Sequence, residues 1–239
     1  MSLQDKRVVI IGGTSGIGYA NAKAAIDDGA AVVIASSNTE RINQAIKSLG
    51  HSAEGRVVDV RNEATVRALF DELGSFDHLV YTAGEPLTLT ELPSLALEQA
   101  REFFDIRYWG ALSAAKYASP RIRPGGSIVL SSGSAGARPE KGWAVAASIT
   151  GAIEALTRAL AVELAPVRVN AVAPGVVRTE MWDGLPHTER EALYNSVGAA
   201  LLTGRVGEPE DIAQAQLFLM RDAFVTGTVV PVDGGARLV

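Results

Sequence analysis

The sequence predicts an α/β protein whose strands form one doubly wound parallel sheet of about seven strands flanked by helices. Short apolar runs alternate with segments of helical periodicity along all 239 residues. Most of these runs contain no alternating polar positions, which is typical of parallel strands covered on both faces. Strand–helix alternation also implies right-handed crossovers, and these produce a parallel sheet.

Strands and helices are expected to alternate along the chain. The strands are predicted at residues 8–11, 31–35, 56–58, 78–81, 127–130, 167–172 and 228–232. The helices are predicted at about 16–29, 39–49, 63–74, 94–119, 144–165, 187–203 and 209–221. This order is typical of a Rossmann-type fold. Pro231 cannot donate a ladder hydrogen bond, so the last strand should lie at an edge of the sheet.

No linker or internal repeat divides the chain, so residues 1–239 are interpreted as a single domain. The segment at about 179–204 interrupts the rhythm of strands and helices. We expect this segment to form a lid over a substrate.

Composition excludes several classes of function. The chain has no cysteine, so disulfides and thiolate metal sites are excluded, and we expect no metal site. The net charge is −5 without a basic block, which argues against nucleic acid as a partner. No run of 18 uninterrupted apolar residues and no signal-peptide pattern occur, so we expect a cytoplasmic protein without a membrane partner.

A glycine-rich turn joins the first predicted strand to the first predicted helix. Glycines stand at Gly12, Gly16 and Gly18 within the segment 10–18. Glycine lets backbone N–H groups approach a diphosphate closely, and the helix N-terminus adds unpaired donors and a positive dipole end. The turn therefore predicts a phosphate-binding site.

The motif Gly12-x-x-x-Gly16-x-Gly18 resembles that of the short-chain dehydrogenase/reductase family, and the resemblance extends along nearly the whole chain. The other segments that carry it are Asp59-Val60, Thr82-Ala83-Gly84, Asn170-Ala171-Val172-Ala173-Pro174-Gly175 with Thr179, and Asp233-Gly234-Gly235. The resemblance implies NAD(H) or NADP(H) as cofactor and a small-molecule substrate. The cofactor-binding residues that it implies are Gly12, Thr14, Ser15, Gly16, Ile17, Gly18, Ser36, Ser37, Asn38, Arg41, Asp59, Val60, Ala83, Gly84, Pro174, Gly175, Val177 and Thr179.

The second strand ends without the acid that binds the ribose 2′-hydroxyl of NAD. Ser36 stands at that position, followed by Ser37 and Asn38, and Arg41 lies nearby. Hydroxyl and guanidinium groups can donate to a 2′-phosphate, so NADP(H) is favoured over NAD(H). The alternative is that the two serines simply end the strand.

The catalytic pattern of the family is broken in this chain. Family members usually use a Ser, an Asn and a Tyr-x-x-x-Lys pair for acid–base chemistry beside a hydride donor. Ser132 best matches the serine, with Ser134 close enough to compete. The helix after residue 150 fixes the register, and it sets Ala146 at the tyrosine position and Thr150 at the lysine position.

Arg107 aligns with the usual asparagine on the helix expected at 94–119. A long arginine could fill the space of the missing lysine and bind the cofactor ribose or an anionic or carbonyl ligand. The alternative is a surface ion pair with Glu102 or Asp105. The Tyr19-x-x-x-Lys23 spacing lies in the wrong part of the fold, so it is rejected as the catalytic pair. Substitute proton donors are sought at Tyr81, Tyr108, Ser134, Lys141, His187 and Tyr194.

The sequence thus predicts an NAD(P)-dependent oxidoreductase that reduces carbonyls or oxidises alcohols with an atypical active site containing Ser132 and Arg107. Two alternatives remain open: an inactive NADP(H)-binding sensor or oligomer partner, and a lyase or isomerase on the same fold. In the family, the helices expected at 94–119 and 144–165 pair across a two-fold axis, so we also expect a homodimer or homotetramer.

Overall fold

The computed structural model describes residues 2–86 and 89–239, and within them one seven-stranded sheet runs through the molecule. The strand order is β3-β2-β1-β4-β5-β6-β7, and every pair of neighbours is parallel. The strands are β1 (Arg7–Ile11), β2 (Ala31–Ser36), β3 (Ala53–Val57), β4 (Phe76–Tyr81), β5 (Ile122–Ser131), β6 (Arg168–Pro174) and β7 (Val229–Val232). This is the predicted doubly wound fold, and Pro231 lies in an edge strand as expected.

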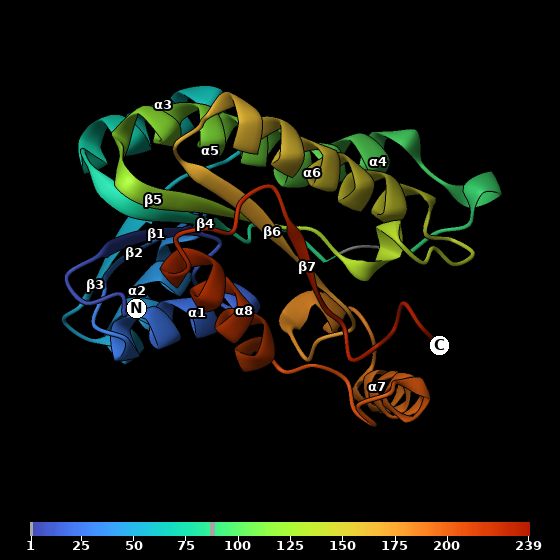
Figure 1. Ribbon diagram of the computed structural model, residues 1–239. Helices are drawn as coiled ribbons and strands as arrows, with labels where there is room; N and C mark the ends of the chain where they lie inside the picture. The colour runs from blue at the N-terminus through green and yellow to red at the C-terminus, as the bar shows by residue number, and fades with distance from the viewer. Residues whose placement is uncertain (1, 87–88) are drawn as a thin grey trace.

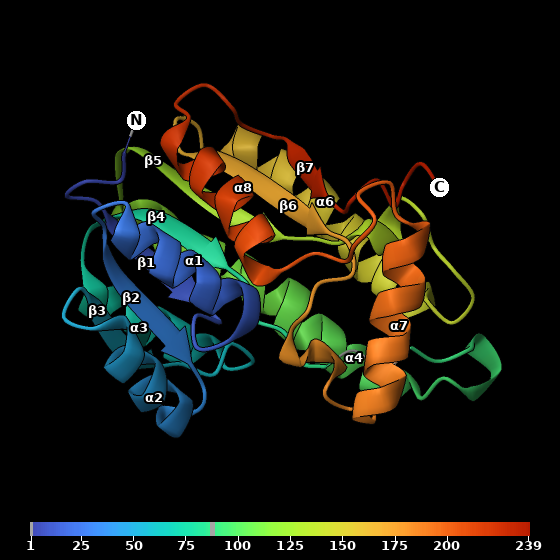
Figure 2. The same ribbon diagram turned by 90° about the horizontal axis from the view of Figure 1, so that it is seen from below.

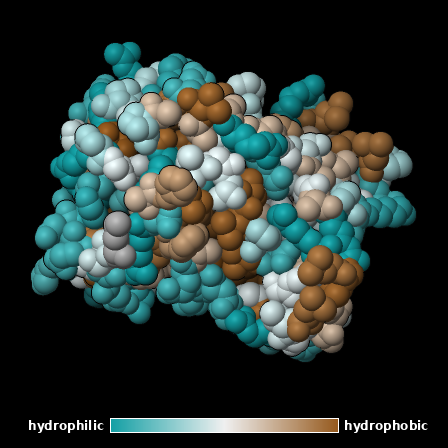
Figure 3. Space-filling view, in the orientation of Figure 1, coloured by the Kyte–Doolittle hydropathy of each residue, from teal (hydrophilic) through white to brown (hydrophobic). Residues whose placement is uncertain are grey.

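Helices cover both faces of the sheet (Figures 1 and 2). One layer contains α3 (Glu63–Leu73), α4 (Leu97–Phe104), α5 (Gly110–Ala118) and α6 (Ala144–Glu163). The other layer contains α1 (Gly16–Asp27), α2 (Thr39–Leu49) and α8 (Pro209–Arg221). The remaining helix, α7 (His187–Ala200), stands apart beyond the carboxyl ends of the strands. Hydrophobic side chains gather on the surface over α7 and the C-terminal segment (Figure 3).

The strands divide their side chains between two cores. On β1, Val9 and Ile11 pack under α3, α5 and α6, whereas Val8 and Ile10 pack under α1 and α8. This alternation follows from the two-residue period of a strand. Because apolar side chains are buried on both faces, the central strands show the continuous hydrophobic runs of the sequence.

Two predicted segments differ from the observed ones for identifiable reasons. The third strand is Ala53–Val57 rather than 56–58, because an edge strand with half its surface in solvent tolerates the polar Glu54 and Arg56. The helix predicted at 94–119 consists of α4, a π-helical turn at Asp105–Trp109, and α5. The π turn interrupts the regular i→i−4 ladder without a glycine or proline to signal it.

Among the described residues, one helix is long and apolar enough by composition to cross a membrane. This helix is α6, with a mean hydropathy of 1.4. Its side chains Ile149, Ile153 and Leu160 are buried, and α6 packs against β6 and β5. It therefore serves as a core helix of this fold.

Candidate active site

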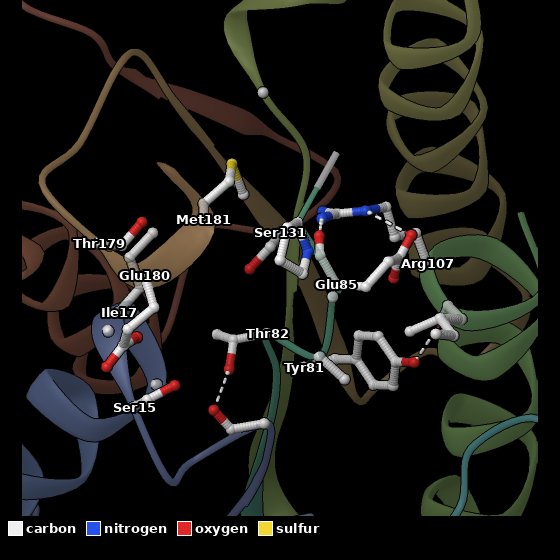
Figure 4. Close-up of a pocket in the computed structure, with 18 of the residues that line it drawn as sticks. Ser15, Ile17, Tyr81, Thr82, Glu85, Arg107, Ser131, Thr179, Glu180 and Met181 are labelled. Atoms are coloured by element: carbon white, nitrogen blue, oxygen red, sulfur yellow. Dashed lines mark hydrogen bonds and ion pairs between the residues drawn. The ribbon is translucent and has the colours of Figure 1, made fainter. Parts of the chain in front are cut away.

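The carboxyl ends of the strands open into a cavity of about 730 Å³. Every cofactor-binding residue predicted from the sequence lines this cavity, and so do Ser132 and Arg107. The glycine turn and α1 form one side, and Arg107 stands on the other (Figure 4). Crevices at the carboxyl edge of such a sheet, where the strand order reverses, are the usual ligand sites of this topology.

Backbone crowding explains the glycines at the first turn. A Cβ atom added to Gly12 would lie 2.5 Å from the backbone nitrogen of Ala83, and one added to Gly18 would lie 2.1 Å from the Gly12 oxygen. Gly12 also has a φ of 89°, which disfavours other residues. The turn therefore brings β1, β4 and α1 closer together than side chains would permit.

The start of α1 has no side-chain cap, and the nearest acid is Glu180, whose Oε2 lies 3.5 Å from a Cβ built on Gly16. Ser15 occupies the N-cap position, yet its side chain makes no capping hydrogen bond, and no acid stands in the first helical turn. The first amide groups of a helix have no intrahelical acceptor and lie at the positive end of its dipole. This geometry fits a diphosphate group. Thr179 lies across the cleft, with its methyl carbon 3.2 Å from a Cβ built on Gly16.

The far end of the cavity lies between β2 and β3. Asn38 caps α2 by accepting a hydrogen bond from the Arg41 amide at 3.0 Å. Among the described residues the Arg41 guanidinium forms no hydrogen bond or ion pair, so it is free to receive a phosphate. Arg61 binds the Asp59 carboxylate through two hydrogen bonds of 3.0 Å, and these lower the pKa of Asp59.

On the α6 side of the cavity, the two positions where family members carry tyrosine and lysine hold no suitable proton donor. Ala146 has no polar side-chain atom. The Thr150 hydroxyl donates back within α6, 3.0 Å from the Ala146 oxygen and 3.1 Å from the Ala147 oxygen. Because threonine has no acidity in the neutral range and this hydroxyl is already engaged, neither residue can perform the expected acid–base step.

Two serines at the end of β5 line the cavity but differ in their partners. The Ser132 hydroxyl lies 3.2 Å from the Thr150 carbonyl oxygen and 3.4 Å from Oε1 of Glu154, so it is directed toward α6. The Ser131 hydroxyl is buried and has no hydrogen-bond partner in the described part of the chain. Sequence reasoning overlooked Ser131, although strand alternation predicts that neighbouring side chains point to opposite faces.

Arg107 pairs with neither of its expected surface partners. Its Nη2 donates to the Glu85 carbonyl oxygen, and its Nε lies 3.6 Å from Oε1 of the Glu85 side chain. The two side chains are only 21% and 24% exposed. Sequence reasoning also missed Glu85, for which the only signal was an acid directly after Gly84 at the end of a strand.

Most of the substitute proton donors considered from the sequence do not reach the cavity. The lining residues include Tyr81 and Ser134 but not Tyr108, Lys141, His187 or Tyr194. The Tyr81 hydroxyl points away from the cavity and donates to the Ile106 carbonyl oxygen (Figure 4). Burial also raises the pKa of Tyr81 far above its usual value, so Tyr81 is poorly suited among the candidates to supply a proton.

Comparison with known proteins agrees with this architecture. A family model described as enoyl-(acyl carrier protein) reductase matches residues 12–237. Short-chain dehydrogenase/reductase ATR9 of Stachybotrys chlorohalonatus is 40% identical, with 99% of both chains covered. A 3alpha-hydroxysteroid dehydrogenase of Mediterraneibacter gnavus is 35% identical, again with 99% of both chains covered.

Two solved structures are also similar. A small-chain dehydrogenase in complex with NADPH is 36% identical with a TM-score of 0.84, covering 99% of this chain and 100% of that one. The MalC Reductase/Diels-Alderase from Malbranchea aurantiaca is 32% identical with a TM-score of 0.92, covering 99% and 98%. The chain therefore belongs to the short-chain dehydrogenase/reductase family, a family of oxidoreductases.

Proposed function

We propose that this chain is an NADP(H)-dependent oxidoreductase that reduces a carbonyl group, or oxidises an alcohol, of a small-molecule substrate with an atypical active site. The observation that carries the proposal is the single cavity that joins the glycine turn to Arg107 and the end of β5. A dinucleotide needs such a continuous crevice, with a phosphate site at one end of a helix. The bound cofactor would supply the hydride.

The cofactor preference rests on charge at the end of β2. Ser36 replaces the acid that would repel a 2′-phosphate, and Arg41, whose guanidinium has no partner in the described part of the chain, also lines the cavity. Guanidinium groups bind phosphate through charge-assisted hydrogen bonds. The NADPH complex of a relative that is 36% identical supports the same preference.

Arg107 and Ser132 are proposed to act on the substrate side. A partly buried guanidinium can bind an oxygen that gains negative charge. Ser132 can bind the same oxygen only after its hydroxyl leaves the Thr150 carbonyl. We therefore propose that Ser132 contributes less than Arg107 to stabilising the charge on that oxygen.

The segment at about 179–204 is proposed to be the lid, and the domain to be a single unit over residues 1–239. Arg178 connects the lid to the segment before α8 through two ion pairs. Its guanidinium lies 3.1 Å from Glu191 of α7 and 3.5 Å from Glu208, the residue before α8. It also lies 4.3 Å from the ring centre of Tyr194, in cation–π contact.

We also propose a homodimer or homotetramer. Trp109 in the π turn is 56% exposed and Val162 on α6 is 83% exposed, although both are large apolar side chains. Exposed apolar side chains on neighbouring helices are typical of association surfaces. The hydrophobic surface over α7 and the C-terminal segment, which includes Leu202 and Leu238, is a second candidate (Figure 3).

Mixing the protein with NADPH and a panel of aldehydes, ketones, quinones and cyclic steroid-like ketones tests the proposal directly. We expect substrate-dependent loss of the absorbance of reduced nicotinamide with at least one carbonyl compound. Binding of NADPH without turnover across a broad panel would favour the inactive sensor. Conversion of a substrate without oxidation of NADPH would favour the lyase or isomerase.

A further inference from the structure

The cavity wall around Arg107 holds buried polar atoms that form no hydrogen bond to the described residues. They are both carboxylate oxygens of Glu85, Nε of Arg107 and the Ser131 hydroxyl, and the contact among them is the ion pair of 3.6 Å between Arg107 Nε and Glu85 Oε1. Buried polar groups in folded proteins are nearly always hydrogen-bonded, so such a cluster requires an explanation. Other described residues with such atoms lie outside this cavity, and they are Asn21, Ser113, Gln216, Asp233 and Arg237. The Glu85, Arg107 and Ser131 group differs from them in facing the cavity, where a ligand can complete its hydrogen bonds.

The Arg107 guanidinium is held rigidly on this wall. A Cβ atom added to Gly84 would lie 2.7 Å from its Cζ, so the guanidinium lies directly against the backbone after β4. Its hydrogen bond to the Glu85 carbonyl fixes it further. Arg107 stands in a π-helical turn, and such turns occur frequently at functional sites. As a result, the Glu85 carboxyl is held beside a fixed positive charge at the edge of the cavity (Figure 4).

The surroundings of Glu85 favour the protonated form of its carboxyl more than water does. Burial raises the pKa of the Glu85 carboxyl above its usual value, while the neighbouring charge of Arg107 opposes that rise. Groups with such opposed influences are poised for acid–base catalysis.

We propose that Glu85 and Arg107 replace the missing tyrosine and lysine of the family. Glu85 exchanges the proton with the substrate oxygen, and Arg107 binds that oxygen and stabilises its negative charge. This inference rests on the proposed oxidoreductase function and identifies the group that completes it.

In the reducing direction, the proton of the product alcohol comes from Glu85. As the carbonyl carbon receives its hydride from the cofactor, the carbonyl π pair becomes a third lone pair on the oxygen. The O–H bond of Glu85 breaks, and its proton forms the O–H bond of the product alcohol. The resulting Glu85 carboxylate is paired with Arg107 until solvent returns a proton. In the oxidising direction the carboxylate accepts the alcohol proton.

Proton counting on cofactor binding tests this assignment without a known substrate. The nicotinamide ring is positively charged in NADP+ and neutral in NADPH, so NADP+ favours ionisation of a nearby carboxyl. Calorimetric titrations in buffers of different ionisation enthalpy give the number of protons released. We expect NADP+ binding to release up to about one proton per site at pH values above the ordinary glutamate pKa of about 4.3, and NADPH binding to release fewer.

Glu85→Gln keeps the shape of the side chain and removes its ionisable proton. We expect this variant to bind both cofactor forms without the extra proton release. Glu98→Gln is the control, because the Glu98 side chain is 82% exposed and does not line the cavity. An unchanged proton count in Glu85→Gln, or an equal loss in both variants, overturns the assignment.

Arg107→Gln provides a second, independent readout. Because Arg107 favours the ionised form of Glu85, its removal should shift proton release to higher pH. A release curve at the same pH contradicts the pairing. Once a substrate is found, Glu85→Gln should also lower kcat by about 100-fold or more. If wild-type protein binds neither dinucleotide, the oxidoreductase function itself fails, whereas binding with a proton count independent of Glu85 and Arg107 rejects only this inference.

Discussion

The glycine turn on one side of the cavity is built from backbone, whereas the Arg107 wall on the other side is built from side chains. At the turn, Gly12 and Gly18 permit contacts between main-chain atoms that no other residue allows. At the wall, the family pair is absent from Ala146 and Thr150, and a pair of different chemistry, Glu85 and Arg107, lines the same cavity.

This difference shows which parts of a site tolerate change. A backbone cradle depends on the fold itself, so altering it disturbs the positions of β1, β4 and α1 together. A side-chain wall depends only on which chemical groups reach the substrate side of the cavity. Side chains from different helices and strands can supply those groups. The nucleotide side therefore keeps the family pattern, while the substrate side departs from it.

The strongest test of the backbone side is Gly18→Val. A Cβ atom at this position would lie 2.1 Å from the Gly12 oxygen, so the start of α1 must move away from the turn. We expect the dissociation constant for NADPH to rise at least about 1,000-fold, equivalent to about 4 kcal/mol. Fluorescence titration measures the loss, and circular dichroism verifies the fold. Gly151→Ala, with open space around its Cβ, is the control that should bind normally.

His78 on β4 is a second buried titratable group, and it differs from Glu85 because its side chain has a hydrogen-bond partner in the core. Its Nδ1 lies 2.8 Å from the Ser127 hydroxyl, and burial lowers the pKa of His78 to about 4. The unfolded chain binds this proton at a pKa near 6.5, so the folded state loses stability as pH falls from about 6.5 through 4. We expect a loss of up to about 3 kcal/mol.

Chemical denaturation across this pH range, with His78→Gln as the reference, measures that contribution. The variant should lack the His78 part of the acid sensitivity and should bind NADPH like wild type. Parallel stability curves for the two proteins would show that His78 does not titrate in this way. Altered cofactor binding in the variant would contradict the comparison, in which His78 is a hydrogen-bonded core residue and Glu85 belongs to the cavity wall.

The smallest effect is expected at Arg41. If its unpaired guanidinium binds the 2′-phosphate, Arg41→Ala should weaken NADPH binding about tenfold, roughly 1.4 kcal/mol, and leave NADH binding unchanged. Competition titrations with both dinucleotides measure the ratio. Arg56→Ala on β3 is the matched control, because Arg56 pairs with Glu54 and does not line the cavity. If the variant binds NADPH and NADH with equally reduced affinity, Arg41 contributes only general positive charge and does not bind the 2′-phosphate.

The sequence predicted the sheet, the edge position of Pro231 and the residues around the cavity, because these depend on local patterns. Hydrophobic periodicity, turn glycines and motif spacing are all carried by neighbouring residues. The Glu85–Arg107 pair was not predicted, because it depends on a π-helical turn and on contact between residues 22 positions apart. Strand alternation predicts the different directions of Ser131 and Ser132, but the partners of Ser132 on α6 depend on tertiary packing.

Calorimetric titration of the wild-type protein with NADPH tests the central claim most directly. We predict saturable binding at one site per chain that Gly18→Val abolishes, since the diphosphate is expected to rest on the amides at the start of α1. A well-folded wild-type protein that gives no binding heat with either NADPH or NADH would contradict the account.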